Sequence, residues 1–244
     1  MNDTIALLKN HRTIRRFTDE PVPDGNIREA VAAGQMASTS SAVQAYSILR
    51  VRDDIKRRKI AELCGPQDKV AECPAFFVVC ADSRRHRLAA ERDGFDYDQR
   101  LEAFLVGVID ASLFAEKMAI ALESMGYGIC YIGGLRNCLS DVDAVLGTPE
   151  GVYPLFGLCV GRPDEEPSRR PRLPVDAVLM EETYDSDDRV LAKLDEYDAT
   201  YRAYLADRGA PSEDGWSQRM AQKYPTPSRP DLAAFYAGKG ADLR

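Results

Sequence analysis

The first residues that could do chemistry form a basic stretch near the N-terminus, His11-Arg12-Thr13-Ile14-Arg15-Arg16. It holds three arginines, a histidine and a hydroxyl within six residues. A guanidinium presents a planar fork of N–H donors, which suits a phosphate dianion better than an ammonium does. The stretch is therefore a candidate phosphate site. Taken alone, it is better explained as a solvated run of charge.

A second basic cluster, Arg169-Arg170-Pro171-Arg172, lies far along the chain. The chain as a whole is acidic, with 39 Asp and Glu residues against 32 Lys and Arg and a formal net charge of −7. This balance argues against a broad nucleic-acid-binding face, so the arginines indicate a small anionic ligand. If folding brings the two clusters together, they would hold one anion from both sides.

Three loops have residue types that suit a flat, polar ligand. Ser38-Thr39-Ser40-Ser41 offers hydroxyls to a polyhydroxylated chain or a ring edge. In Tyr131-Ile132-Gly133-Gly134, two glycines allow a close approach of the backbone. Gly65-Pro66-Gln67 is a weaker third candidate. An ordinary helix end or tight turn accounts for each loop on its own.

Several other kinds of site are disfavoured by the sequence. It contains no G-x-G-x-x-G fingerprint, P-loop, G-x-S-x-G elbow or H-E-x-x-H motif. With two histidines and six cysteines that lack C-x-x-C spacing, we expect no metal site. Most cysteines lie in apolar runs, which is typical of core residues with free thiols in a reducing cytoplasm. We expect neither a secretory signal nor a membrane span.

The elements that must position these residues follow from periodicity. Residues 75–81 form a continuous apolar run, which predicts a strand covered on both faces. Residues 98–125 keep three-and-four apolar spacing, which predicts a long central helix. Residues 84–97 are polar and poorly periodic, so we expect an irregular surface excursion that includes His86. Further helices are predicted at 3–10, with Asp3 as its N-cap, and at 24–36, 53–64, 139–146, 187–207, 216–223 and 231–237. Further strands are predicted at 46–51, 129–132 and 152–160.

These elements predict an α+β fold, because strand–helix alternation is too sparse for a doubly wound sheet. Five segments in chain order resemble the FMN-dependent nitroreductases, in particular the oxygen-insensitive NADPH nitroreductases and flavin reductases. They are HRTIRRFTDEPV, STSSAVQAYSILRV, YIGGLRN, VYPLFGLCVGRP and RRPRLP. The resemblance implies a mostly antiparallel sheet flanked by helices, a core of residues 1–174 and a C-terminal helical extension of residues 175–244. It also implies a homodimer with FMN at the subunit interface.

The resemblance assigns cofactor contacts residue by residue. His11, Arg12, Thr13, Arg170 and Arg172 would hold the FMN phosphate. Arg15, Ser40, Ser41 and Gln67 would meet the ribityl chain and the pyrimidine end of the flavin. Tyr131, Ile132, Gly133 and Gly134 would line the ring. No catalytic acid or base is expected, because the flavin itself carries the redox chemistry.

The tail would contact the nicotinamide and the electron acceptor, through Arg229, Glu213 and Asp214. NADPH-preferring relatives carry a basic residue between the long C-terminal helix and the tryptophan, where this chain has Glu213 and Asp214. A carboxylate repels a 2′-phosphate, so we expect NADH to serve at least as well as NADPH.

The sequence thus predicts a cytoplasmic NAD(P)H-dependent FMN oxidoreductase that works by a ping-pong cycle on nitroaromatics, quinones or flavins. Two alternatives remain open at this point. One is a dedicated flavin reductase that passes reduced FMN to a partner. The other is a non-enzymatic regulatory protein that binds a phosphorylated ligand.

Overall fold

The computed structural model describes residues 2–244, which divide into two compact units. The first unit runs up to Pro167 and includes Arg229–Arg244. The second unit is Ser168–Ser228. The division expected from the sequence, at residue 174, stays a prediction.

The first unit is built on a four-stranded sheet in the order β1-β2-β4-β3. All neighbouring strands are antiparallel, which confirms the predicted sheet. The strands are β1 (Tyr46–Arg50), β2 (Ala75–Asp82), β3 (Gly128–Ile132) and β4 (Val152–Gly161). Every residue of β2 is buried, as its apolar run predicted. The outer edge of β3 is joined by Thr13, which forms a parallel bridge with Ile129.

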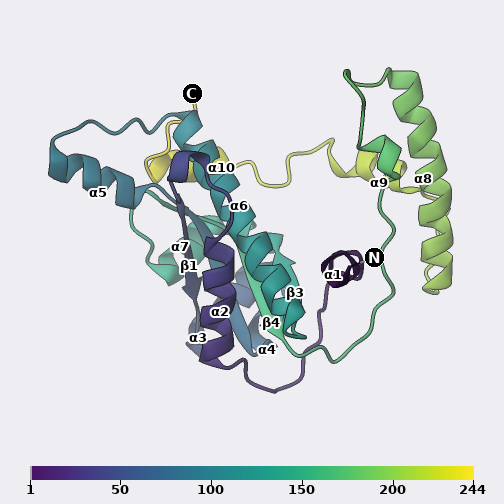
Figure 1. Ribbon diagram of the computed structural model, residues 1–244, viewed down its shortest axis with the longest axis horizontal. Coiled ribbons are helices and arrows are strands. Elements are labelled where there is room, and N and C mark those ends of the chain that lie inside the picture. Colours follow the sequence, from purple (N-terminus) through teal and green to yellow (C-terminus); the bar gives the residue numbers. More distant parts are fainter. Residues whose placement is uncertain (1) are drawn as a thin grey trace. The chain divides into compact units, whose positions relative to one another are not determined.

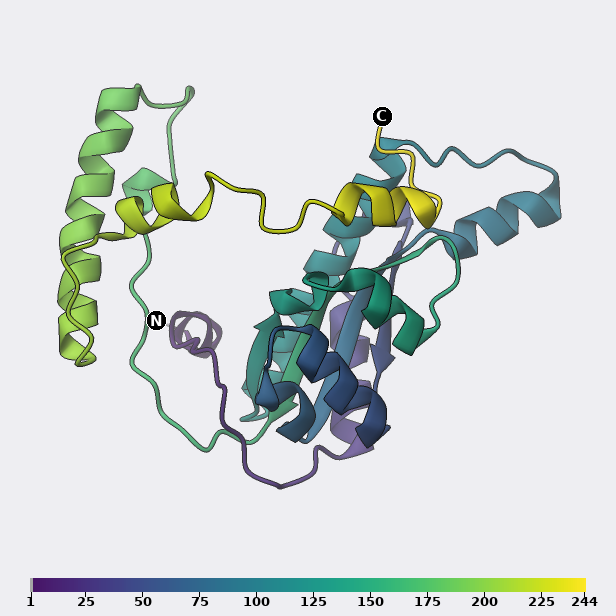
Figure 2. The ribbon, with the colours of Figure 1, turned by 180° about the vertical axis from the view of Figure 1, so that it is seen from behind.

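Helices cover both faces of this sheet, because side chains alternate along each strand. Phe77 and Val79 of β2 belong to the core under α2 (Asp24–Gln35) and α6 (Leu101–Ser124), which lie side by side in Figure 1. Phe76 and Val78 belong to the opposite core. There the sheet is covered by α3 (Asp54–Leu63), α4 (Asp68–Glu72) and α7 (Leu139–Leu146), seen from behind in Figure 2. The C-terminal helix α10 (Leu232–Gly238) adds Tyr236 to the first core.

The long helix α6 confirms the element predicted over 98–125, with slightly shorter bounds. Its buried side carries Gly107, Ala111 and Ala115, and a side chain at Gly107 would come within 3.0 Å of Ala81. These small residues let the helix lie close to the sheet. Its opposite side leaves a stripe of large apolar residues 40–54% exposed. They are Leu101, Leu105, Ile109 and Leu113.

Two elements differ from the prediction. Arg84–Asp93 forms helix α5, where an irregular excursion was expected. The helix buries no residue, so it leaves no apolar period in the sequence, and it ends at Gly94 in the left-handed conformation. The N-terminal helix α1 (Asp3–Lys9) is capped by Asn2 rather than Asp3, since the Asn2 side chain accepts a hydrogen bond from the Ile5 N–H at 2.9 Å.

The second unit consists of the 3₁₀ turn Val175–Ala177, α8 (Asp187–Asp207) and α9 (Trp216–Lys223). Trp216 packs edge-on against Tyr197, with ring centroids 5.7 Å apart. Across residues 2–244, no helix combines the length and the apolar character needed to cross a bilayer. Nor does this range contain a group of three or more His, Cys, Asp or Glu side chains placed to hold a metal ion.

Candidate functional site

The basic stretch runs along the edge of β3, and its one apolar member fixes its position. Ile14 is buried, and its N–H donates to the Ile129 carbonyl at 3.0 Å. The Ile14 side chain lies against Gly128, where any side chain would overlap it. With Ile14 inserted in this way, His11, Arg12 and Thr13 are half-buried at the surface and Arg15 is exposed.

Carboxylates surround this stretch. The Nδ1 of His11 lies 2.6 Å from Glu123 on α6, and Arg12 Nη1 donates to Glu166 at 2.7 Å. Glu165 accepts hydrogen bonds from the backbone N–H groups of Arg15 and Arg16. Within the described chain, the Nε of Arg12 is buried without a hydrogen-bond partner. Since a buried donor normally finds an acceptor, this atom marks the stretch as fit for an anionic ligand.

A second group of predicted residues meets at the end of β3. Gly134 packs on the turn that contains Gln67. A side chain at Gly134 would overlap the Cys64 carbonyl and come within 2.5 Å of Gln67 Nε2. Gln67 Nε2 in turn donates to that carbonyl at 3.1 Å. The structure therefore makes neighbours of two motifs that lie 67 positions apart (134 minus 67) in the sequence. A side chain at Gly133 would meet only Arg136, at 3.6 Å, so this backbone is open to a ligand.

Two arginines border the same place. Arg229 donates through Nε to the Asn137 side chain at 3.0 Å. Arg136 donates to the Leu155 carbonyl at 2.6 Å. Desolvation by burial lowers the pKa of Arg136, and the nearby Arg229 guanidinium lowers it further. Arg136 was missed in the sequence, although it lies only two positions after the glycine motif. The pair makes this corner strongly electropositive.

The other two residues of the glycine motif have different surroundings. Tyr131 is 36% exposed, and its hydroxyl donates to Glu116 on α6 at 3.2 Å. Desolvation raises the pKa of Tyr131, and the Glu116 carboxylate adds to the shift. Ile132 is buried in the core beneath α3 and α7. Only its backbone is therefore available to a ligand, which narrows the role predicted for it.

The serine loop lies elsewhere on the first unit. Ser40 and Ser41 are exposed, and Ser40 is bound to Asp110 of α6. His11 is bound to Glu123, thirteen residues further along the same helix (123 minus 110). At 1.5 Å per residue, the two anchor points are roughly 20 Å apart. One chain therefore does not bring Ser40 and Ser41 together with His11.

The remaining predicted residues belong to the second unit. Arg172 Nη1 donates to the Arg170 carbonyl at 3.0 Å. The Glu213 carbonyl accepts from Arg202 Nη1 at 3.4 Å, and the Asp214 N–H donates to Ser212 Oγ at 3.2 Å. The Glu213 side chain is exposed.

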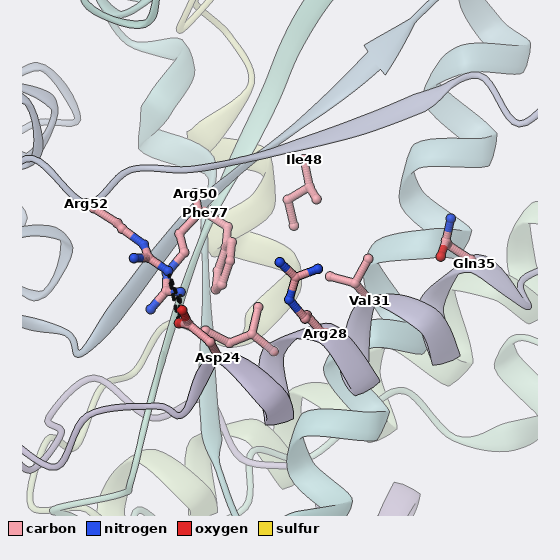
Figure 3. Close-up of a pocket in the computed structure, with 9 residues that line it drawn as sticks. Asp24, Arg28, Val31, Gln35, Ile48, Arg50, Arg52 and Phe77 are labelled. Carbon is pink, nitrogen blue, oxygen red and sulfur yellow. Dashed lines mark hydrogen bonds and ion pairs between the residues drawn. The ribbon is translucent and has the colours of Figure 1, made fainter.

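The structure also contains a basic cavity that the sequence did not predict (Figure 3). It measures about 500 Å³ and lies between α2 and β1, at the sheet edge opposite β3. Arg50 and Arg52 both pair with Asp24, and these hydrogen bonds lower the pKa of the Asp24 carboxyl. Arg28 lines the same cavity. Since the three arginines are scattered in the sequence, no local motif indicates the cluster.

Comparison with known proteins extends the resemblance over the whole chain. Residues 8–162 match the Nitroreductase family, and residues 170–244 match the Nitroreductase family, C-terminal domain. The "FMN reductase (NADPH)" of Bacillus subtilis is 44% identical over 98% of both chains. The "NADPH-flavin oxidoreductase" of Vibrio harveyi is 39% identical over the full length of both. The solved structure of B. megaterium NfrA1 superposes with a TM-score of 0.96 at 40% identity, covering 99% of this chain and 100% of that one.

Proposed function

This chain belongs to the nitroreductase family, and we propose that it is an NAD(P)H-dependent FMN oxidoreductase. Its acceptors are nitroaromatics, quinones or flavins, reduced in two-electron steps. The relatives named above both carry reductase names, which favours an enzyme over a phosphate-binding regulatory protein. The single observation that carries the proposal is the basic stretch on the edge of β3, with its unpartnered Arg12 Nε.

The residues present fit an FMN phosphate and a flavin ring. When bound, FMN supplies the redox chemistry, because it accepts a hydride from a nicotinamide and gives two electrons to an acceptor. Arg12 offers an unused buried donor to the phosphate, and Arg170 and Arg172 would add cations from the second unit. Glu166 pairs with Arg12 through an exposed carboxylate, so a phosphate can displace it at small cost.

At the ring, this chain's residues orient the flavin and stabilise negative charge. Gln67 and Arg15 are the donors proposed for the pyrimidine end, where the reduced ring carries its charge. Gly133 and Gly134 let the backbone approach the ring edge, because a side chain at Gly133 would meet only Arg136, at 3.6 Å. Tyr131 presents an exposed face beside them. Arg229 and Arg136 make the neighbouring surface suitable for an anionic donor or acceptor.

We further propose that the protein is a homodimer and that each flavin contacts both subunits. Ser40 and Ser41 are too far from His11 along α6 to share a ligand's phosphate end within one chain. A second copy would supply the serine loop. The exposed apolar stripe of α6, from Leu101 to Leu113, is a suitable surface for that contact.

A cytoplasmic location is proposed from the thiols. The six cysteines are free, and all but Cys138 are buried. Free thiols persist in a reducing compartment. Detection of the protein in a soluble cytoplasmic fraction would test this.

The central experiment is a visible spectrum of the purified protein, followed by assays with NADPH and NADH. We expect flavin absorption, about one FMN per chain and acceptor reduction with ping-pong kinetics. Light scattering should give twice the 27.1 kDa chain mass. Colourless protein that takes up no FMN would contradict the proposed function. A monomer that keeps its FMN would contradict only the shared site.

A dedicated flavin reductase is the second candidate, favoured by the name of the B. subtilis relative, "FMN reductase (NADPH)". In that case free FMN is a substrate as well as a cofactor. The two functions differ in acceptor preference. A much higher kcat/KM for free FMN than for quinones and nitroaromatics would favour the flavin reductase.

A further inference from the structure

The loop of residues 39–45 has a backbone that its own sequence does not favour. Ser41, Ala42 and Gln44 all have positive φ, at 46°, 58° and 53°. Residues with a Cβ atom rarely adopt this left-handed region, and none of the three is glycine. Such a conformation persists only where the surrounding structure holds it. The holding groups must therefore lie outside the loop.

One holding group is Asp110 on α6, which is completely buried. Its Oδ1 accepts the Ser40 N–H at 3.1 Å, and its Oδ2 accepts the Ala45 N–H at 3.0 Å. One carboxylate thus ties together the two ends of the loop. A fully buried carboxyl group on an apolar helix face is costly unless hydrogen bonds satisfy it, which argues for a specific use.

The second holding group is His86 on α5. It was expected to be a surface residue, but it is half-buried, and its Nε2 lies 2.7 Å from the Val43 carbonyl. Because a carbonyl only accepts, Nε2 carries the proton. The ring also stacks on Tyr97, with centroids 6.3 Å apart. His86 therefore holds the middle of the loop, between the two ends that Asp110 holds.

We propose that Asp110 and His86 are positioning residues that fix the left-handed loop 39–45 and thereby set the affinity for FMN. This inference rests on the proposed function, in which Ser40 and Ser41 meet the flavin. Neither residue touches the cofactor. Both act by keeping the two serines in the conformation that binds. If the loop is competent for only a tenth of the time, the apparent Kd rises about tenfold.

The first test replaces the carboxylate. In Asp110→Asn, the amide NH₂ faces one of the two backbone N–H groups, so one end of the loop is released. We expect the FMN Kd, measured from flavin fluorescence on dilution of the loaded protein, to rise about tenfold. The matched control is Asp143→Asn. Asp143 is a half-buried carboxylate on α7 that binds Lys239 at 2.9 Å on the other side of the sheet. It should keep the wild-type Kd.

The second test separates the ring of His86 from its hydrogen bond. His86→Phe keeps an aromatic ring beside Tyr97 but removes the donor, and should raise the Kd severalfold. His86→Gln loses the ring but places an amide N–H where Nε2 lies, and should restore most of the affinity. If the ring of His86 mattered only for packing, His86→Phe would keep the FMN Kd and His86→Gln would raise it. This pair of variants keeps the inference testable if Asp110→Asn does not fold.

The outcomes are distinct. Wild-type protein that binds no FMN overturns the proposed function and this inference together. Wild-type protein that binds FMN while His86→Phe and any folded Asp110→Asn keep its Kd overturns the inference alone. The inference is also overturned if Asp143→Asn raises the FMN Kd as much as Asp110→Asn does. A raised Kd in Asp110→Asn and His86→Phe, with recovery in His86→Gln, supports it.

Discussion

Two loops of this molecule are held by a buried aspartate on a long helix, and they are held differently. Asp110 of α6 binds both ends of loop 39–45, from Ser40 to Ala45. Asp198 of α8 binds the first residues of α9, through the Ser217 N–H at 2.8 Å and the Ser217 hydroxyl, with the Trp216 N–H as a further donor. The first carboxylate closes a loop, whereas the second fixes the start of α9 and leaves residues 211–214 with few restraints.

The difference matches the ligands proposed for the two regions. A cofactor that stays bound through many turnovers benefits from a preorganised loop, because the ordering cost is met by folding. A nicotinamide that binds and leaves in each cycle suits a segment that can adapt. The comparison therefore predicts that changes to the residues proposed to bind FMN, which we call the flavin side, alter how tightly FMN is held. Changes around 211–217 should instead alter the stability of the second unit or the choice between NADH and NADPH.

The largest expected effect tests whether the flavin side depends on its cations. Arg12→Ala with Arg172→Ala should raise the FMN Kd by roughly a hundredfold to ten-thousandfold, because each lost charge-assisted hydrogen bond costs about 1.5–3 kcal/mol. Fluorescence titration measures it. Arg92→Ala with Arg244→Ala is the matched control, since these exposed arginines pair only with neighbouring aspartates. Equal loss of FMN in both double variants would mean that net charge, not the site, holds the phosphate.

The next effect compares two glycines, one in each region. An alanine at Gly134 would overlap the Cys64 backbone carbonyl, and an alanine at Gly215 would overlap the Asp198 side chain. We expect Gly134→Ala to lower the free energy of unfolding by about 3 kcal/mol and to weaken FMN binding, because a backbone carbonyl cannot move aside as a side chain can. Gly215→Ala should destabilise the second unit, and while that unit stays folded it should change the FMN Kd far less than Gly134→Ala does. Thermal unfolding and flavin titration of both variants would decide, and a reversed pattern would break the comparison.

The third prediction concerns Asp198 itself. Desolvation pushes its pKa up, but the hydrogen bonds from Ser217 and Trp216 outweigh it and hold the pKa below the usual range. A carboxyl with a lowered folded pKa stabilises at neutral pH, and this stability disappears as the pH falls below about 4. Asp198→Asn should thus cost about 2 kcal/mol of unfolding free energy at pH 7, and this cost should shrink as the pH falls below about 4.

Trp216 makes this measurement selective. It is the only tryptophan of the chain and lies next to Ser217, so its fluorescence reports the second unit. Unfolding curves of the wild type and Asp198→Asn should differ at pH 7 and converge in acid. A difference that stays constant with pH would show that the ionised carboxylate is not what stabilises α9.

The sequence predicted the sheet and α6 well because buried periodicity is a local signal. The run 75–81 became a fully buried strand, and 98–125 became α6. The sequence did not predict α5, because no residue of 84–93 is buried and the segment therefore shows no apolar periodicity. The assignment of His86 to the surface failed with it, because the partner, Val43, lies 43 residues away.

The candidate site divides in the same way. Short motifs, such as Gly133-Gly134 and Gly65-Pro66-Gln67, could be recognised one by one from the sequence. Groups assembled from distant positions could not. Asp110 looked like a charge within an apolar helix, and nothing local indicates that it binds Ser40 and Ala45. The arginine cavity between α2 and β1 has the same origin, since its members come from separate elements.

The smallest expected effect concerns the choice between NADH and NADPH as electron donor. We expect the segment 211–214 to determine this choice. Glu213 is exposed and Asp214 is half-buried. The Glu213 carbonyl accepts a hydrogen bond from Arg202 at 3.4 Å, and the Asp214 N–H donates locally to Ser212. Two carboxylates there repel a 2′-phosphate, so we expect NADH to be used at least as well as NADPH, although both relatives named above are called NADPH enzymes.

Glu213→Arg with Asp214→Arg should shift the ratio of kcat/KM toward NADPH by roughly tenfold, the equivalent of about 1.4 kcal/mol. The shift is modest because the site is partly exposed and the charges are screened by solvent and salt. Asp195→Arg with Glu196→Arg makes the same charge change on the exposed side of α8 and should leave the ratio unaltered. Arg202 is the cation that could offset the carboxylates, since it already reaches the Glu213 backbone. A hundredfold preference of the unmodified protein for NADPH, lost in Arg202→Ala, would show that Arg202 and not the acidic pair governs donor choice.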